Sequence, residues 1–185
     1  ARIQARVHAR GLPGSAFNEP GNVGAPSWSC DESLVGLFGD GTKWVCGLTE
    51  LASRESGCVV YSFGGAANTQ FENAIRDITR CDVHTFALDC HERCLWGGAC
   101  YAGERLTCHK VRVGGKDDPK TVPPTLSLPS MMKTLGHDHV DILKIDIEGG
   151  EYDVLAALLD DGRLPFSQLL VEFHQRLVDA ATRTQ

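Results

Sequence analysis

Four side chains able to move a proton follow two apolar runs near the end of the sequence. Asp146 and Glu148 end the first run, and Glu172 and His174 end the second. Histidine has an ordinary pKa of about 6.5, which suits proton removal near neutral pH. We therefore expect His174 to act as a general base that Glu172 orients. Glu148 and Asp146 are alternative bases, and a histidine that only satisfies a backbone carbonyl is the structural alternative.

The two acids of the first run allow a second interpretation. Asp146 and Glu148 could hold a divalent cation, because hard cations prefer carboxylate oxygens. We keep this as the less favoured alternative and assign no metal site.

A second set of residues points to an adenosine-bearing cofactor. Gly64 and Gly65 follow the apolar run 58–63, and Asp89 follows the run 83–88. Sites for such cofactors usually have a glycine turn after one strand and an acid after the next, because a carboxylate accepts both hydrogen bonds from a ribose diol. The turn lacks the G-x-G-x-x-G spacing, so it does not separate S-adenosylmethionine from a nicotinamide cofactor. A tight turn that merely requires glycine is the structural alternative.

These residues must be positioned by strands and helices that alternate along the chain. Apolar runs alternate with helical patterns, which predicts βαβ units and a mostly parallel sheet. The carboxyl ends of parallel strands share one edge, where ligands bind. The predicted strands are 58–63, 83–88, 106–113, 140–147 and 168–173, and the predicted helices begin at Asn68 or Thr69, after Gly150 and at Gln175.

The first 26 residues differ from the rest of the chain. Arg2, Arg6 and Arg10 recur every four residues, which predicts one short helix with a basic stripe. Residues 11–26 are rich in Gly, Pro, Asn and Ser and are expected to form a linker. We therefore divide the chain into a helix and linker over 1–26 and one domain over 27–185.

Composition limits the functions that are open to this chain. Its 185 residues are 42% hydrophobic and carry a net charge of −6, which fits one core and argues against a nucleic-acid partner, since phosphate contacts need clustered Lys and Arg. No stretch approaches the roughly 18 to 20 apolar residues that span a bilayer, so we expect no membrane contact within this segment. A neutral or weakly polar small molecule is the easier substrate.

Eight cysteines lie between positions 30 and 108. An even, high number favours disulfides and an oxidising compartment, although eight cysteines allow 105 pairings. Free thiols are one alternative. A zinc site on Cys90, Cys94, Cys100 and Cys108 is another, but Cys108 and His109 are adjacent and would point to opposite faces of a strand.

One motif is more specific than these patterns. The run Asp141-Ile142-Leu143-Lys144-Ile145-Asp146-Ile147-Glu148-Gly149-Gly150-Glu151-Tyr152 resembles the motif of the FkbM-like methyltransferases. Other blocks agree in the same order: Gly39-Asp40-Gly41-x-x-Trp44-Val45-Cys46, Cys58-Val59-Val60-Tyr61-Ser62-Phe63-Gly64, Phe71-Glu72, His109-Lys110-Val111, Gly114-Gly115-Lys116-Asp117, Leu135-Gly136-His137 and Val171-Glu172-Phe173-His174. Together they cover roughly residues 30 to 175.

The resemblance implies an α/β fold, namely a Rossmann-like class I methyltransferase with a mostly parallel sheet and helices on both faces. It also implies S-adenosylmethionine as cofactor and methylation of oxygen, with carbohydrate hydroxyls as the acceptors of several relatives. The cofactor positions that it implies are Gly64, Asn68, Glu72, Asp89 and Asp146.

The sequence departs from the family pattern at several positions. The ribose-binding acid directly follows the Phe of the second strand in relatives, whereas here Ala87 follows Phe86 and the acid is Asp89. Ala66 and Asn68 replace a glycine and an acid in the first turn. The sequence also ends before the antiparallel hairpin that completes the sheet of relatives, so we expect those C-terminal strands to be missing.

We therefore expect an S-adenosylmethionine-dependent O-methyltransferase that acts on a carbohydrate hydroxyl of a small-molecule or glycan acceptor. The cysteines place it in the lumen of the secretory pathway, in the ER or Golgi, or outside the cell. The alternative is a secreted module without catalysis, whose partners would be proteins. A nicotinamide enzyme with a related fold is a third hypothesis.

Overall fold

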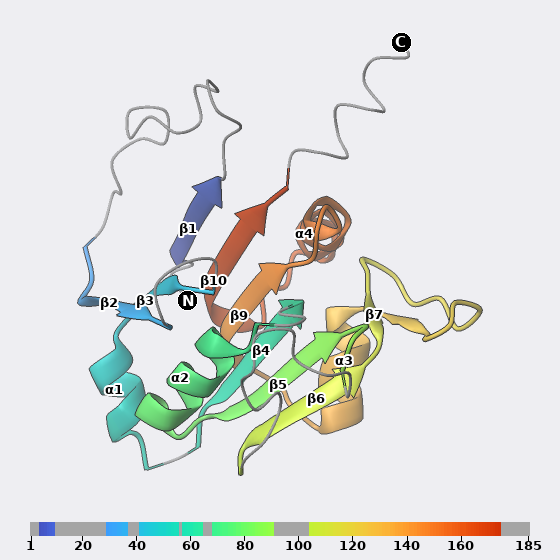
Figure 1. The fold of residues 1–185 in the computed structure, drawn as a ribbon. Helices are drawn as coiled ribbons and strands as arrows, with labels where there is room; N and C mark the ends of the chain where they lie inside the picture. The colour runs from blue at the N-terminus through green and yellow to red at the C-terminus, as the bar shows by residue number, and fades with distance from the viewer. Residues whose placement is uncertain are drawn as a thin grey trace.

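Six parallel strands form the sheet that organises the molecule, in the order β1-β10-β9-β4-β5-β6 (Figure 1). The computed structural model describes residues 4–9, 29–36, 41–55, 57–64, 68–90 and 104–174. The strands of the sheet are β1 (Gln4–Ala9), β4 (Val59–Gly64), β5 (Asp82–Ala87), β6 (Leu106–Lys110), β9 (Val140–Asp146) and β10 (Phe166–Phe173). All adjacent strands are parallel, so their carboxyl ends lie along one edge.

The central strands are buried on both faces. In β9 every residue from 140 to 145 is buried, and only Asp146 at its end is half-buried. This explains why the sequence shows a continuous apolar run there rather than an alternating one. The strands predicted over 58–63, 83–88, 140–147 and 168–173 are thereby confirmed to within two residues at each end.

Helices cover both faces of the sheet, as predicted. One face packs against α3 (Leu128–Leu135) and α4 (Glu151–Asp161), and the other against α1 (Leu48–Ser53) and α2 (Gln70–Thr79) (Figure 1). A hairpin of β2 (Glu32–Val35) and β3 (Lys43–Cys46) adds to the second face. The two cores are separate sets of buried side chains, so the sheet is the layer between them.

The N-terminal segment corrects one prediction. Gln4–Ala9 forms the edge strand β1 and not a helix, and it pairs with β10 from Gln4 opposite Gln168 onward. A spacing of four residues is even, so it puts side chains on one face of a strand as well as of a helix. The arginine pattern therefore could not distinguish the two. The predicted linker over 11–26 lies outside the described residues.

The third predicted strand also differs from the structure. Residues 106–113 form two strands, β6 and the short β7 (Arg112–Val113), which pairs with β8 (Thr125–Leu126) in a separate sheet. The backbone N–H of Val111 donates to the carbonyl of His109, which breaks the extended run. The hairpin, α1 and α3 were not predicted, and the helix predicted at Gln175 lies outside the described residues.

Three disulfides join the cysteines of the described residues. They pair Cys30 with Cys46, Cys58 with Cys81 and Cys90 with Cys108. Cys90 and Cys108 form a disulfide and offer no thiolate to a metal ion. The zinc alternative is therefore wrong for these two residues. Cys94 and Cys100 lie outside the described residues. Within the part of the chain that the structure describes, no helix has the length and apolar character needed to cross a bilayer.

Candidate functional site

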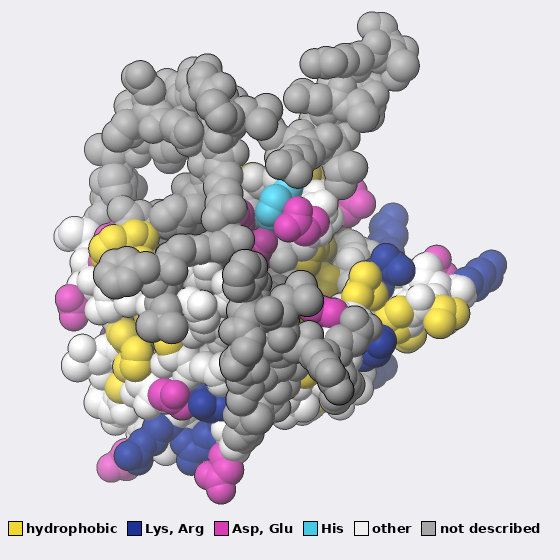
Figure 2. Space-filling model, in the orientation of Figure 1, with side chains coloured by type: hydrophobic (Ala, Val, Ile, Leu, Met, Phe, Trp, Pro, Cys, Tyr) yellow, Lys and Arg dark blue, Asp and Glu magenta, His cyan; other side chains and the backbone are white. Residues whose placement is uncertain are grey.

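The candidate site lies at the carboxyl edge of the sheet, where β4, β9 and β10 end side by side. Gly64 pairs with Asp146 in the ladder between β4 and β9. Acidic side chains and a histidine gather at this edge, above the ends of β9 and β10 (Figure 2). The structure thus brings together Gly64, Asp146, Glu172 and His174, four residues that the sequence placed at separate strand ends.

Gly64 is required by the contact between two strands. Its φ is +84°, a conformation that favours glycine, and a Cβ at this position would lie 1.7 Å from the carbonyl oxygen of Asp146. Any side chain at position 64 would therefore collide with the backbone of β9. This confirms the need for glycine, although the reason visible here is the neighbouring strand.

A buried carboxylate lies beside Ser62, near the end of β4. Glu72, in the first turn of α2, is fully buried. Its Oε1 accepts hydrogen bonds from Ser62 Oγ at 2.5 Å and from Lys144 Nζ at 3.3 Å. Among the described residues, its Oε2 has no hydrogen-bond partner. A buried carboxylate oxygen without a donor is costly, so this atom is suited to accept a hydrogen bond from a ligand.

Lys144 supplies the positive charge that this carboxylate needs. It projects from the middle of β9 and is 2% exposed. Burial alone would lower the pKa of the ammonium, but the carboxylates of Glu72 and Asp146 outweigh it and raise that pKa. Lys144 is therefore a cation inside the sheet, and it links Glu72 to the edge at Asp146, whose Oδ2 lies 3.9 Å away.

The β2–β3 hairpin brings a second lysine to the edge. Lys43 Nζ lies 2.9 Å from Glu172 Oε2 and 3.6 Å from Asp146 Oδ2. The hairpin is fixed to β10 by Gln168, whose amide accepts from the backbone N–H of Cys46 and donates to its carbonyl. Glu172 is therefore a buried partner of Lys43.

His174 is held by a different acid from the one expected. Its Nδ1 lies 2.9 Å from Glu151 Oε1, at the start of α4. Our prediction that Glu172 orients the ring is wrong, because Glu172 forms its short contact with Lys43 instead. Glu151 is fully buried, and its two oxygens also accept from the backbone N–H groups of Ile147 and Gly149.

Three carboxylates surround the ring of His174, those of Asp146, Glu148 and Glu151. Burial lowers the pKa of the imidazole, but the hydrogen bond to Glu151 and the carboxylates of Glu148 and Asp146 raise it more, so the net shift is upward. With Nδ1 donating to Glu151, the lone pair is on Nε2, which lies 3.7 Å from Asp146 Oδ1 and 3.7 Å from Glu148 Oε2. Nε2 thus faces the edge where a substrate would lie.

Glu148 differs from the other acids of the edge. It has a φ of 54° in the turn after β9, and its side chain is 86% exposed. His174 is half-buried and held in one orientation by Glu151, which makes it the better candidate. Asp146, Glu172 and His174 form a group whose ligand atoms lie within 4.8 Å of one another, and Glu148 does not belong to that group. A cation held by Asp146 and Glu148 alone stays an untested alternative.

The remaining predicted cofactor residues lie at the ends of β4 and β5. Asn68 precedes α2 and accepts from the backbone N–H of Gln70, and a Cβ on Gly41 would lie 2.8 Å from its amide nitrogen. Asp89 lies in the half-buried turn after β5, beside Cys90 with its disulfide to Cys108. Ala66 lies outside the described residues.

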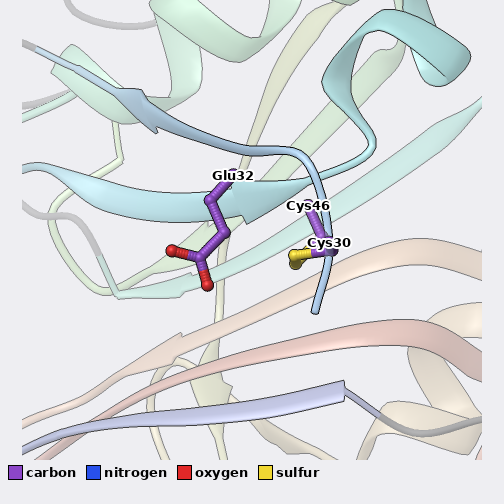
Figure 3. A group of neighbouring side chains, drawn as sticks. All are labelled: Cys30, Glu32 and Cys46. Atoms are coloured by element: carbon purple, nitrogen blue, oxygen red, sulfur yellow. A yellow bond between two sulfur atoms is a disulfide. The ribbon is translucent and has the colours of Figure 1, made fainter. Parts of the chain in front are cut away.

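A second group of potential metal ligands is excluded by its chemistry. Cys30, Glu32 and Cys46 lie together on the hairpin (Figure 3). The two sulfurs form a disulfide and offer no thiolate, so we assign this group a structural role.

A cluster of rings packs on the α3 side of the sheet. His84 Nδ1 lies 3.0 Å from His109 Nε2, and Tyr61 Oη lies 2.7 Å from His137 Nδ1. Burial, and then the neighbouring His109 and His137, lower the pKa of His84 to about 4. Burial also lowers the pKa of His109 and raises that of Tyr61. Tyr61 belongs to the core and the three histidines are half-buried around it, so we assign this cluster to the packing of the α3 side.

Three functional candidates were missed in the sequence: Lys43, Lys144 and Glu151. One signal was available, because a lysine inside a buried apolar strand must have an acidic partner. That argument would have identified Lys144. Lys43 and Glu151 are defined by partners in other elements, and no local pattern marks them.

Comparison with known proteins agrees with this arrangement. The chain matches the family described as "Methyltransferase domain" over residues 19–183. It is 30% identical to "Probable methyltransferase-like protein 24" from Rattus norvegicus over 129 residues, which are 65% of this chain and 34% of that protein. The protein of the same name from Homo sapiens is 29% identical over the same length and shares.

The match therefore spans about a third of the length of these curated relatives. No solved structure gives a significant match. The sequence blocks described above also resemble the branch that contains methyltransferase-like protein 24, and the comparison confirms this resemblance. Since the family covers most of the chain, and the parallel sheet with helices on both faces agrees with it, this chain belongs to the methyltransferase domain family.

Proposed function

We propose that this chain transfers a methyl group from S-adenosylmethionine to a hydroxyl oxygen, with a carbohydrate as acceptor, in the lumen of the secretory pathway or outside the cell. Family membership supports methyl transfer in general. The cofactor, the acceptor and the location are argued below from the residues of the edge.

The observation that carries the proposal is the unpartnered Oε2 of Glu72. S-adenosylmethionine has an ammonium group and a ribose diol, which can donate hydrogen bonds to a carboxylate, and a positively charged sulfonium, which a carboxylate attracts through its charge. Glu72 offers such an atom beside Ser62 of β4. Asp89, in the turn after the neighbouring strand β5, is the acid that we assign to the ribose, and Asp146 and Asn68 complete the set. The residues present thus fit the cofactor.

When bound, S-adenosylmethionine supplies an activated methyl group, so the chain itself needs mainly to align the acceptor. Alignment contributes up to roughly 7 to 11 kcal/mol in ideal cases. His174 then removes the proton of the hydroxyl through Nε2, a role worth about 10² to 10⁴-fold in rate. Glu151 stabilises the imidazolium that forms, since it accepts from Nδ1.

The acids of the edge suit an acceptor rich in hydroxyl groups. Asp146 and Glu148 lie 3.7 Å from His174 Nε2 and present carboxylate oxygens, which accept hydrogen bonds from sugar hydroxyls. The net charge of −6 disfavours nucleic acid and other polyanions as acceptors. A neutral glycan or small carbohydrate is the class that fits.

The proposed location depends on the disulfides. The described residues contain three disulfides. Three disulfides in a protein of this size are unusual in a reducing cytosol and ordinary in secreted proteins.

Calorimetry with S-adenosylmethionine and its demethylated product tests the cofactor. We expect one site for each on the folded chain, and at least tenfold weaker binding for Glu72→Gln. Glu50→Gln is the matched control, because Glu50 is an exposed glutamate in the first turn of α1. A folded chain that binds neither compound would overturn the enzyme proposal and favour a module that binds protein partners.

The acceptor is tested by transfer of labelled methyl from S-adenosylmethionine to a panel of neutral glycans. We expect label in an alkali-stable ether on the sugar, and its loss with His174→Ala. Label found only on protein or nucleic acid would contradict the carbohydrate proposal and leave the cofactor proposal intact.

A further inference from the structure

The ammonium group of Lys43 lies beside three residues that could otherwise hold a metal ion. Asp146, Glu172 and His174 each offer one ligand atom, and these atoms lie within 4.8 Å of one another. Two carboxylates and an imidazole are ligands that manganese and similar divalent ions accept. The ammonium of Lys43 lies 2.9 Å from one of these carboxylates and 3.6 Å from the other.

The lysine is held in this position by several contacts. Its side chain is 3% exposed and that of Glu172 is 6% exposed, so their contact is out of bulk water. Three residues further along β3, Cys46 is bonded to Cys30 and hydrogen-bonded to Gln168 on β10. A buried ammonium without its carboxylates would be strongly destabilising, so Lys43 and the acids stabilise each other.

A divalent ion would meet strong repulsion while Lys43 is in place. Lys144 Nζ also lies 3.9 Å from the Asp146 oxygen that faces Lys43. Two ammonium groups therefore already act on that carboxylate. A third cation on the same oxygens would be within a few ångströms of both, in a region where water screens little.

We propose that Lys43 is a built-in cation that takes the place of a divalent metal at the catalytic edge. It positions the carboxylates of Asp146 and Glu172 and keeps metal ions away, which leaves His174 Nε2 for the acceptor. Lys43 is thus a positioning residue. The inference concerns the edge used in the proposed function, but its readout is metal binding, so it can fail or succeed whether or not methyl transfer is observed.

Removal of the lysine should uncover a metal site. Manganese bound to the folded chain is measured by the loss of the electron paramagnetic resonance signal of free Mn²⁺, with calorimetry for stoichiometry. We expect no saturable binding at this site for the wild type or for Lys43→Arg, which keeps the charge. Lys43→Met should bind one Mn²⁺, at concentrations at least tenfold below the highest at which the wild type shows no saturable binding. Lys43→Met/Glu172→Gln should no longer bind this ion.

Circular dichroism and thermal unfolding establish which variants are folded. If Lys43→Met does not fold, Lys43→Gln takes its place, because its amide can still donate to Glu172. A folded variant that binds Mn²⁺ no better than the wild type would overturn the proposal. So would a wild-type chain that binds one Mn²⁺ which Glu172→Gln abolishes, and this second measurement needs no lysine variant.

Discussion

Glu151 Oε1 lies 2.9 Å from Nδ1 of His174, across the 23 positions that separate the end of β10 from the start of α4. The same carboxylate accepts from the backbone N–H groups of Ile147 and Gly149. One buried side chain therefore fixes the turn after β9, the start of the helix and the tautomer of the histidine. The turn after β9 therefore holds Glu151 in place, and Glu151 in turn fixes the orientation of His174.

The pH dependence of methyl transfer should report on this pair. Because the pKa of His174 is raised, the ring is protonated below that pKa and becomes a base only as the pH rises through it. We expect kcat/KM to increase with pH and then level. Glu151→Gln removes the negative charge, which lowers the pKa and moves the rising limb to lower pH. Proton NMR of the ring measures the same shift independently of activity, and a limb that does not move would contradict the assignment.

The buried pair of Lys144 and Glu72 should dominate the stability of the central sheet. Lys144→Met leaves a buried carboxylate without its cation, which typically costs about 3 to 5 kcal/mol. The double variant Lys144→Met/Glu72→Gln should cost about 1 kcal/mol or more less than the sum of the single variants. Urea unfolding measures all three. Arg163→Gln is the control, since its partner Asp161 is exposed, and strict additivity would show that the pair does not interact.

Gly64 should tolerate no side chain. Gly64→Ala places a methyl group against the Asp146 carbonyl in a left-handed conformation, and we expect a loss of about 3 kcal/mol or more. Gly162→Ala is the matched control. Gly162 has a φ of +66° with nothing within 4 Å of its added Cβ, so it should lose only about 1 to 2 kcal/mol. Equal losses in urea unfolding would mean that the contact with Asp146 is unimportant.

The ring cluster should make the fold sensitive to acid. The pKa of His84 is about 4 in the folded chain, against about 6.5 when unfolded. The unfolded chain therefore binds the extra proton first, and stability that is present above pH 6.5 is lost as the pH falls toward 4. We expect His84→Gln to remove on the order of 1 to 2 kcal/mol of this loss between pH 7 and 5, since the ring is partly exposed. Urea unfolding at pH 5 and pH 7 measures this loss, and a loss that is the same in the wild type and in His84→Gln would contradict the assignment.

The disulfides should be detectable directly. Digestion without reductant should yield peptides joined as Cys30–Cys46, Cys58–Cys81 and Cys90–Cys108. Cys58→Ala/Cys81→Ala opens a loop of 23 residues and should cost about 3 kcal/mol. Eight alkylatable thiols in the native protein would contradict both the pairing and the proposed location.

The sequence was most informative where one element determines its own structure. The run at 140–147 is long, apolar and followed by two glycines, so strand, turn and helix α4 could all be predicted. The same holds for β4 and its glycine at position 64. These features depend on local periodicity and on backbone conformation, which neighbouring residues set.

The candidate site was harder to predict because its contacts join distant elements. Lys43 lies in a hairpin strand of four residues, too short to show a pattern, and its partner Glu172 is 129 positions away. Glu172 is two residues from His174 and was the natural choice to orient it. In the structure Glu172 contacts Lys43, and Glu151 is hydrogen-bonded to His174 instead. This arrangement depends on the packing of the hairpin on β10, which the sequence does not reveal.

The pairing of β1 with β10 has a consequence for biosynthesis. Gln4 leaves the ribosome 164 positions before its partner Gln168. At about 5 to 20 residues per second, the first strand waits roughly 10 to 30 s for the strand that completes its ladder. During that time its N–H and C=O groups are open to other extended chains, so this segment is one that a chaperone which shields nascent strands would bind.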